Sequence, residues 1–205
     1  MIKRVLAFFC LILIVILSLS FISAFSFSGL SSNKLTGKVI SGSTENCKSD
    51  LIAYYRFDGS STDTYGSSNG ESVGSISYVP GLIGQAASFP GNIQSYIKLP
   101  NSTIDSKQKI SISMWISTTG SSDGLFSVAR SGETNEILFH RQENLVLFVR
   151  GSGKTISAVM NDGKWHNLLV TIDSPSGQSN VYLDGKLFKT VSISTTTLKA
   201  SSVIL

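Results

Sequence analysis

The chain has 205 residues, which allows one domain plus a leader or a linker. Its Ser, Thr and Gly are abundant and its charged fraction is low (15%), which favours an all-β fold with many turns. The formal net charge is +4, and two of the positive charges, those of Lys3 and Arg4, lie in the leader described below. No Lys/Arg cluster with interleaved aromatic residues occurs, so a nucleic acid is not an expected partner.

The N-terminal 25 residues have the pattern of an export signal. Lys3 and Arg4 precede an apolar run over Val5–Phe25, which serines interrupt towards its end. A short basic region followed by an apolar core is typical of a secretory signal peptide, and Ala24 offers a small residue at the cleavage point. The run is also long enough for an uncleaved signal anchor. Residues 1–25 are therefore predicted to form a leader helix, cleaved or retained, with the rest of the chain outside the cytoplasm, secreted or anchored at the cell surface.

The next segment, residues 26–49, is Ser-rich and polar, and it is predicted to be a linker or stalk. One short strand-like piece, Leu35–Ile40, interrupts it. Cys10 lies in the leader and Cys47 in the linker, so cleavage would leave Cys47 as a free thiol or a site of intermolecular pairing. No Cys/His cluster has the spacing of a zinc site.

The domain is predicted to begin near Asp50 and to consist of short strands. The predicted strands are Leu51–Phe57, Tyr96–Leu99, Lys109–Thr118, Leu125–Ala129, Ile137–Arg141, Leu145–Val149, Thr155–Met160, Trp165–Ile172 and Ser202–Leu205. Between the first two, Asp58–Gly74 consists almost wholly of turn residues, and Val79–Leu82 is a predicted turn. Strands at this spacing, with no helical pattern between them, indicate a two-sheet sandwich.

Two predicted strands show the clearest alternation of apolar and polar residues. In Lys109–Thr118, apolar residues at every second position alternate with serines and Trp115. The face that carries the alternating apolar residues is predicted to belong to the core. In Trp165–Ile172 the apolar face also carries His166, which is predicted to be a structural residue. Further on, Asp184-Gly185 predicts a two-residue type I′ hairpin turn, because that turn needs positive φ at both central positions. The place of Trp115 and Trp165 in these strands favours core packing over an exposed sugar-stacking platform.

From about Asp50 onward, the chain resembles a laminin-G-like domain of the concanavalin A-like superfamily. Four pieces carry the resemblance, in the family's order: Ala53–Asp58, Val79–Phe89, Ile110–Ile116, and Asp162–His166 together with Val181–Lys186. The resemblance implies an antiparallel jelly-roll sandwich of two sheets over residues 50–205, preceded by the leader helix. In the family, a strand like Ser202–Leu205 is followed by a glycine and one or two more strands. The resemblance therefore implies that the domain lacks its last strand or strands.

A missing strand would leave an unpaired sheet edge and an uncovered core. We therefore expect residues Asp50–Leu205, expressed alone, to be marginally stable or to aggregate, and cooperative unfolding at an ordinary midpoint would count against this.

The best candidate metal ligands are Asp58, Asp63 and Asn69, which lie in one polar loop. Calcium prefers carboxylate and amide oxygens from a flexible loop, and the resemblance implies a structural calcium ion there. The family's loop pattern is matched only approximately over residues 63–69. The alternative is a solvated loop without metal, and no other cofactor is expected.

Catalytic motifs are not found. Glycan-cleaving enzymes use a carboxylate pair flanking the sugar bond, and no Glu-x-Asp-x-Glu or similar run occurs. His140 and His166 are the two histidines, and no Gly-x-Ser-x-Gly motif accompanies them. The sequence therefore predicts a protein that is not an enzyme.

Three functions remain open. The first is an extracytoplasmic binding or adhesion module that recognises a glycan or an extracellular protein. The second is an accessory structural domain of a larger secreted or anchored protein, and the third, disfavoured above, is a glycan-cleaving enzyme. Any contact with a membrane would be through the leader. Asn101-Ser102-Thr103 fits the N-glycosylation pattern, whose use depends on the host.

Overall fold

The structure is a computed structural model that describes residues 50–205. The predicted leader (1–25) and linker (26–49) lie outside this range, as do both cysteines. Within it, regular structure is almost wholly β, with one short 3-10 helix, η3 (Asn101–Thr103). No helix among the described residues is long and apolar enough to cross a membrane.

The larger sheet has seven antiparallel strands. In spatial order they are β1 (Glu71–Val73), β4 (Tyr96–Leu99), β13 (Ser202–Ile204), β6 (Gly124–Arg130), β7 (Glu133–His140), β8 (Val146–Val149) and β9 (Ser152–Thr155). The predicted C-terminal strand therefore lies inside the sheet, because β13 pairs with β4 on one side and β6 on the other.

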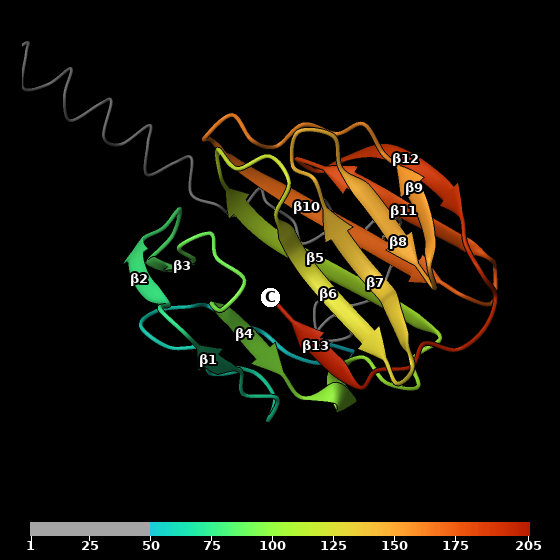
Figure 1. The fold of residues 1–205 in the computed structure, drawn as a ribbon, viewed down its shortest axis with the longest axis horizontal. Helices are drawn as coiled ribbons and strands as arrows, with labels where there is room; N and C mark the ends of the chain where they lie inside the picture. The colour runs from blue at the N-terminus through green and yellow to red at the C-terminus, as the bar shows by residue number, and fades with distance from the viewer. Residues whose placement is uncertain (1–49) are drawn as a thin grey trace, which may run out of the picture. The chain divides into compact units, whose positions relative to one another are not determined.

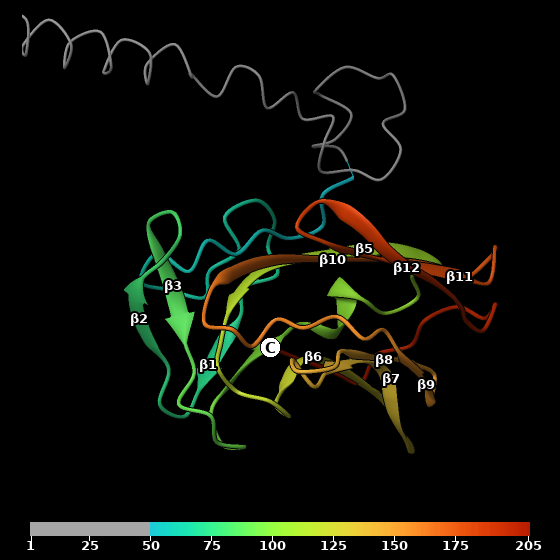
Figure 2. The same ribbon diagram turned by 90° about the horizontal axis from the view of Figure 1, so that it is seen from above.

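The smaller sheet has four antiparallel strands in the order β12 (Lys186–Ser192), β11 (Gln178–Leu183), β10 (Trp165–Asp173) and β5 (Lys109–Ser117). A separate hairpin pairs β2 (Ser77–Pro80) with β3 (Gln85–Ser88). Figure 2 shows the two main sheets as stacked layers. The predicted all-β sandwich is confirmed.

The core lies between the two layers and is built from alternate residues of each strand. On β10, Leu168, Val170 and Ile172 are fully buried, as the alternation predicts. The seven-stranded sheet contributes residues such as Ile97, Val128, Ile137, Leu147 and Val203. The β11–β12 turn has the predicted form, since Asp184 and Gly185 both have positive φ (50° and 76°).

Four predictions along the chain differ from the structure. The predicted turn Val79–Leu82 begins inside β2 (Ser77–Pro80), and only its second half lies in the β2–β3 connection. Leu51–Phe57 is not a strand, and its β pairing consists of one isolated bridge between Tyr55 and Asp63. The strand predicted at Thr155–Met160 lies earlier, as β9 over Ser152–Thr155. Part of the predicted loop Asp58–Gly74 is β1, which pairs with β4. Pairing with a distant segment decides these assignments: β1 is a strand because it pairs with β4, whereas Leu51–Phe57 has β propensity and no ladder.

Candidate ligand-binding face

The outer side of the four-stranded sheet carries aromatic residues that do not enter the core. Trp115 alternates with the core-facing residues of β5, and Trp165 does so on β10. A cross-strand row joins Ser113, Leu169 and Tyr182 on three adjacent strands. We call the surface formed by Trp115, Trp165, Leu169 and Tyr182 the outer aromatic face.

Trp115 is 54% exposed, so the prediction that it packs in the core is wrong. The alternation predicted correctly that it lies opposite the core-facing isoleucines. It gave no information on whether another layer covers the outer side, and half of the indole remains accessible. Trp165 is intermediate in exposure.

Uncharged polar groups surround the aromatic rings. Asn167 lies directly across from Trp115 but is buried (5% exposed), and its side-chain amide donates to Ser113 Oγ (3.3 Å) and to the Met114 carbonyl (3.4 Å). On β11, Asn180 Oδ1 accepts a hydrogen bond from Thr190 Oγ1 (2.7 Å). The outward positions of β5 and β10 carry no charged residue from Ser111 to Ser117 or from Trp165 to Thr171. An aromatic surface packs on the apolar C–H face of a sugar, while fixed amides and hydroxyls can bond its hydroxyls.

A charged cluster joins the two Asp-Gly turns at one end of β10. His166 Nδ1 lies 2.9 Å from Asp184 Oδ2, and His166 Nε2 lies 3.0 Å from Asp162 Oδ1. Asp184 Oδ1 also accepts from the Asn167 N–H (2.9 Å), and Asp162 is paired with Lys164 (3.0 Å). The prediction that His166 is a satisfied structural residue is confirmed.

The protonation states in this cluster follow from these contacts. The hydrogen bond to Asp184 is the largest cause that raises the pKa of His166, and it outweighs partial burial, with Asp162 adding to it. The pKa of Asp162 is lowered, first by the Lys164 N–H. Burial raises the pKa of Asp184, but its bonds to His166 and Asn167 outweigh burial and lower it. Neither carboxyl group therefore holds a proton near neutral pH, as a general acid must.

Asp63 forms the centre of the loop that was predicted to bind calcium. Asp63 Oδ1 accepts hydrogen bonds from the backbone N–H groups of Tyr54 (2.9 Å), Tyr65 (3.0 Å) and Gly66 (2.9 Å). Asp63 Oδ2 accepts one from Ser68 (3.0 Å). Burial raises the pKa of Asp63, but these four donors outweigh burial and bring it down to about 2. The carboxylate is thus solvated by backbone N–H groups, an arrangement suited to an anion that stays charged.

The other two predicted ligands are also engaged. Asn69 Oδ1 lies close to Asp63 and accepts from the Asp63 N–H (3.0 Å). Asp58 bonds elsewhere, to the Gln85 N–H (2.8 Å) and to Arg56 (2.8 Å). Within residues 50–205 no group of three or more His, Cys, Asp or Glu could hold a metal ion. The structure therefore brings Asp63 and Asn69 together and engages Asp58 elsewhere, and calcium binding stays a prediction.

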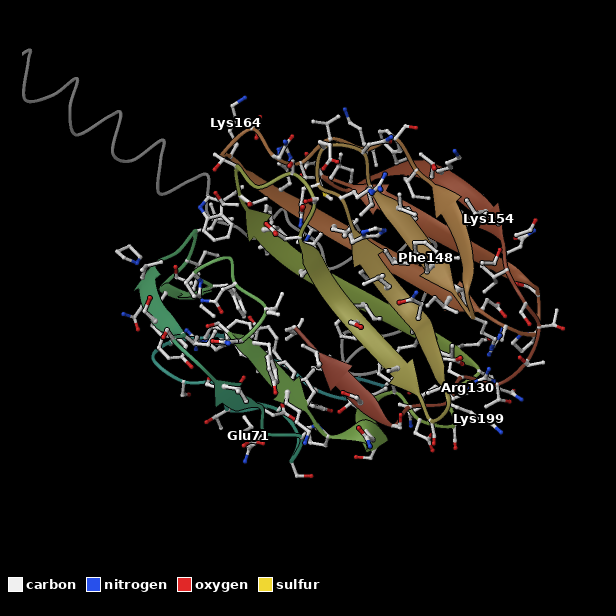
Figure 3. All side chains as sticks on the ribbon, in the orientation of Figure 1. Glu71, Arg130, Phe148, Lys154, Lys164 and Lys199 are labelled. Atoms are coloured by element: carbon white, nitrogen blue, oxygen red, sulfur yellow. The ribbon has the colours of Figure 1, made fainter. Side chains whose placement is uncertain are left out.

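The buried carboxylate of Glu136 is a structural group. It accepts from Arg150 Nε (3.3 Å) and from the Lys199 N–H (3.0 Å), and Arg130 Nε lies 3.9 Å away. Figure 3 shows Arg130 and Lys199 at the same end of the sandwich. These contacts satisfy the buried charge of Glu136.

The possible glycosylation site is tied into the fold. The side-chain amide of Asn101 donates to the Ser201 carbonyl (3.0 Å), and Thr103 is buried. Modification of Asn101 would replace one of the two hydrogens on this nitrogen, so the bond to Ser201 would depend on the hydrogen that remains.

These features define the class of protein as a β-sandwich with an exposed aromatic and polar sheet face. Residues 90–205 match the family described as the concanavalin A-like lectin/glucanases superfamily, and the chain belongs to this family.

Solved structures show the same fold at low sequence identity. Domain 4 of AbnA, a GH43 extracellular arabinanase from Geobacillus stearothermophilus, was solved with arabinotriose. Its sequence is 22% identical to this chain. The match covers 76% of this chain and 82% of that domain, with a TM-score of 0.60. The binding domain of Paraclostridial Mosquitocidal Protein 1 is 16% identical to this chain. The match covers 77% of this chain and 44% of that chain, with a TM-score of 0.59. The search of curated proteins finds no match.

Proposed function

We propose that this protein is a non-catalytic, extracytoplasmic binding module that recognises a glycan on its outer aromatic face. The observation that carries the proposal is the exposed indole of Trp115, which lies on a sheet face whose neighbouring outward groups are uncharged hydroxyls and amides. This chemistry suits a neutral sugar better than a charged ligand. The apolar leader supports a location outside the cytoplasm.

The charged residues support a binding role without catalysis. The carboxyl groups of Asp162 and Asp184 both have lowered pKa values, so neither can act as a general acid near neutral pH. His166 has both ring nitrogens engaged and its pKa raised, so it is a poor general base. The likeness to the arabinanase domain, which was solved with arabinotriose, supports testing arabinose oligosaccharides first.

The test is glycan-array screening of the full chain, followed by titration calorimetry with the best ligand. We expect Trp115→Ala to weaken binding by on the order of tenfold or more, since burying a large apolar side chain contributes about 1.5–3 kcal/mol. Ile93→Ala is a matched control, because Ile93 is an exposed apolar residue (98%) in the loop before β4. Both variants should keep the far-UV circular dichroism and the melting temperature of the parent.

The alternative function is an accessory structural domain with no ligand of its own. If no glycan binds, or if Trp115→Ala and Ile93→Ala bind equally well, the glycan proposal is wrong and this alternative is favoured. Turnover of a polysaccharide by the purified protein would instead favour an enzyme.

A further inference from the structure

The loop before β1 contains a chemically labile dipeptide. Asn69 is followed by Gly70, and none of the other asparagines in the sequence precedes a glycine. Because glycine has no side chain to hinder its backbone nitrogen, this nitrogen can approach the preceding side-chain amide and attack it. Asn69 is exposed, so water can reach the product. In Figure 1 the loop belongs to the blue-green segment that leads into β1.

The fold requires a glycine at position 70. A Cβ atom there would lie 2.8 Å from Ile97 Cγ2 and 3.2 Å from Leu99 Cδ2, and both are buried core residues of β4. It would also lie 3.0 Å from the Ser61 carbonyl oxygen. A larger residue would therefore have to displace core side chains and the loop. The close packing of the loop against β4 thus retains the glycine that makes Asn69 labile.

The closed loop holds both reacting groups in hydrogen bonds. Asn69 Oδ1 accepts from the Asp63 N–H (3.0 Å), and the Gly70 N–H donates to the Ser61 carbonyl (2.9 Å). Ser61 Oγ donates in turn to the Gly70 carbonyl (2.8 Å), and Ser61 is buried. The Gly70 nitrogen is therefore directed at Ser61 and the Asn69 amide at Asp63. A reaction between the two groups requires these bonds to break.

We propose that Asn69 is a site of spontaneous deamidation and that the reaction proceeds when this loop opens. The Gly70 nitrogen bonds to Asn69 Cγ and loses its proton, while the C–N bond of the side-chain amide breaks and ammonia leaves. Water, the one co-reactant, then adds to the cyclic imide and opens it. Opening leaves residue 69 either as aspartate or as isoaspartate, in which the main chain runs through the former side chain.

Either product disfavours closure of the loop. Both carry a carboxylate at residue 69, next to the Asp63 carboxylate, which accepts four backbone N–H groups. Two like charges in contact repel each other. Isoaspartate also adds a methylene group to the main chain, which displaces Gly70 from Ser61. Because ammonia is lost, the conversion is one-way, and it weakens the attachment of the loop to β4.

Asn101 provides an internal comparison for the reaction. It precedes Ser102, and serine is the smallest residue that follows any asparagine of the chain apart from Asn69. Its side-chain amide is also held, by the Ser201 carbonyl (3.0 Å). In the unfolded chain both holds are lost, so the order of conversion of the two asparagines then depends on the following residue alone.

The experiment follows conversion at each asparagine by peptide mass mapping. The full chain, in mild detergent if the leader is retained, is incubated at mildly alkaline pH with EDTA, so that no metal ion holds the loop. One sample is folded and the other is in concentrated guanidinium chloride. We expect Asn69 to convert before Asn101 in the unfolded sample. In the folded sample conversion of Asn69 should be slower by on the order of tenfold or more, because its rate follows the population of the open loop.

A pair of variants tests the hold on Gly70. Ser61→Ala removes the bond to the Gly70 carbonyl, together with a contact to Ser72 Oγ (3.2 Å), and should speed folded-state conversion roughly three- to tenfold. It should leave the rate in guanidinium chloride unchanged. Thr62→Ala, at the exposed neighbouring position, should change neither rate.

Three results would overturn the proposal. They are earlier conversion of another asparagine in the unfolded chain, equal rates for Asn69 in the folded and unfolded samples, and equal folded-state rates for Ser61→Ala and Thr62→Ala. Circular dichroism checks that both variants are folded. The comparison of the folded and unfolded parent chain does not depend on either variant.

Discussion

β10 and β5 are neighbouring strands with the same alternation, the same length and a shared ladder, yet their inner faces differ. Leu168 on β10 is fully buried, whereas Met114, directly across from it on β5, is only partly buried. Among residues 50–205, β10 has a paired strand on both sides whereas β5 has one, and we attribute the difference to this. Alternation therefore tells which side of a strand faces the core, and the number of neighbouring strands decides how completely that side is covered.

The largest expected effect is on the free energy of unfolding. Truncating one core residue on each strand tests the difference between β10 and β5. Leu168→Ala should lower the free energy of unfolding by about 2–5 kcal/mol, because it leaves a cavity in a closed part of the core. Met114→Ala should cost roughly half as much, since water already reaches that side chain and less apolar area is lost. Urea unfolding of both variants measures the two costs, and equal costs would contradict the contrast between the strands.

The second prediction concerns the segment Leu51–Phe57, whose β pairing is limited to one isolated bridge. Tyr54 is tied instead to the Asp63 carboxylate, which accepts four backbone N–H groups in all. Asp63→Ala leaves these donors without their acceptor, so the free energy of unfolding should fall by about 1.5–3 kcal/mol. Thr62→Ala is a control at an exposed neighbouring position. Similar stabilities for the two variants would show that Asp63 does not hold the segment.

Asp63 also predicts how stability changes in acid. Its folded pKa of about 2 lies below its ordinary value of 3.8, so the charged form is favoured in the folded state. This contribution is present above pH 3.8 and is lost as the pH falls towards 2. Thermal melts from pH 5 to pH 2 should therefore show a steeper loss for the parent than for Asp63→Ala. Parallel curves would contradict the lowered pKa.

A smaller effect is expected at His166, at the start of β10. The pKa of His166 is raised above 6.5, so the charged ring is favoured in the folded state. Its stabilising contribution is present below pH 6.5 and is lost as the pH rises through the raised pKa. His166→Gln should flatten the fall of Tm between pH 6 and pH 8.5.

His140 provides the control for this pH dependence, because burial is the largest cause that lowers its pKa. His140→Gln should leave the fall of Tm above pH 6.5 unchanged. A parent curve without any such fall would show that the contacts of His166 with Asp162 and Asp184 do not stabilise the fold.

The smallest expected effect is that of a chelator. Because the Asp63 oxygens accept backbone N–H groups and Asp58 is directed to Gln85 and Arg56, EDTA should leave Tm unchanged. A fall in Tm that calcium reverses and magnesium does not would establish the calcium site that the sequence resemblance implies.

Much of the fold could be predicted from local patterns. The alternation located β5 and β10, and Asp184-Gly185 located the hairpin turn, because both depend on neighbours in sequence. What failed depended on distant partners: Leu51–Phe57 has strand propensity without a ladder, and Trp115 is 54% exposed on the outer side of β5. The resemblance identified the family, and it left the exposed aromatic face undetected.

Hydrogen–deuterium exchange of the free chain tests the contrast between β5 and β10 most directly. We predict that amides along β10 are protected throughout, because both of its neighbours are strands, and that about half of the β5 amides exchange rapidly, because no strand among residues 50–205 pairs with their side of β5. Uniform protection along all nine residues of β5 would contradict this account and would show that the edge is already covered.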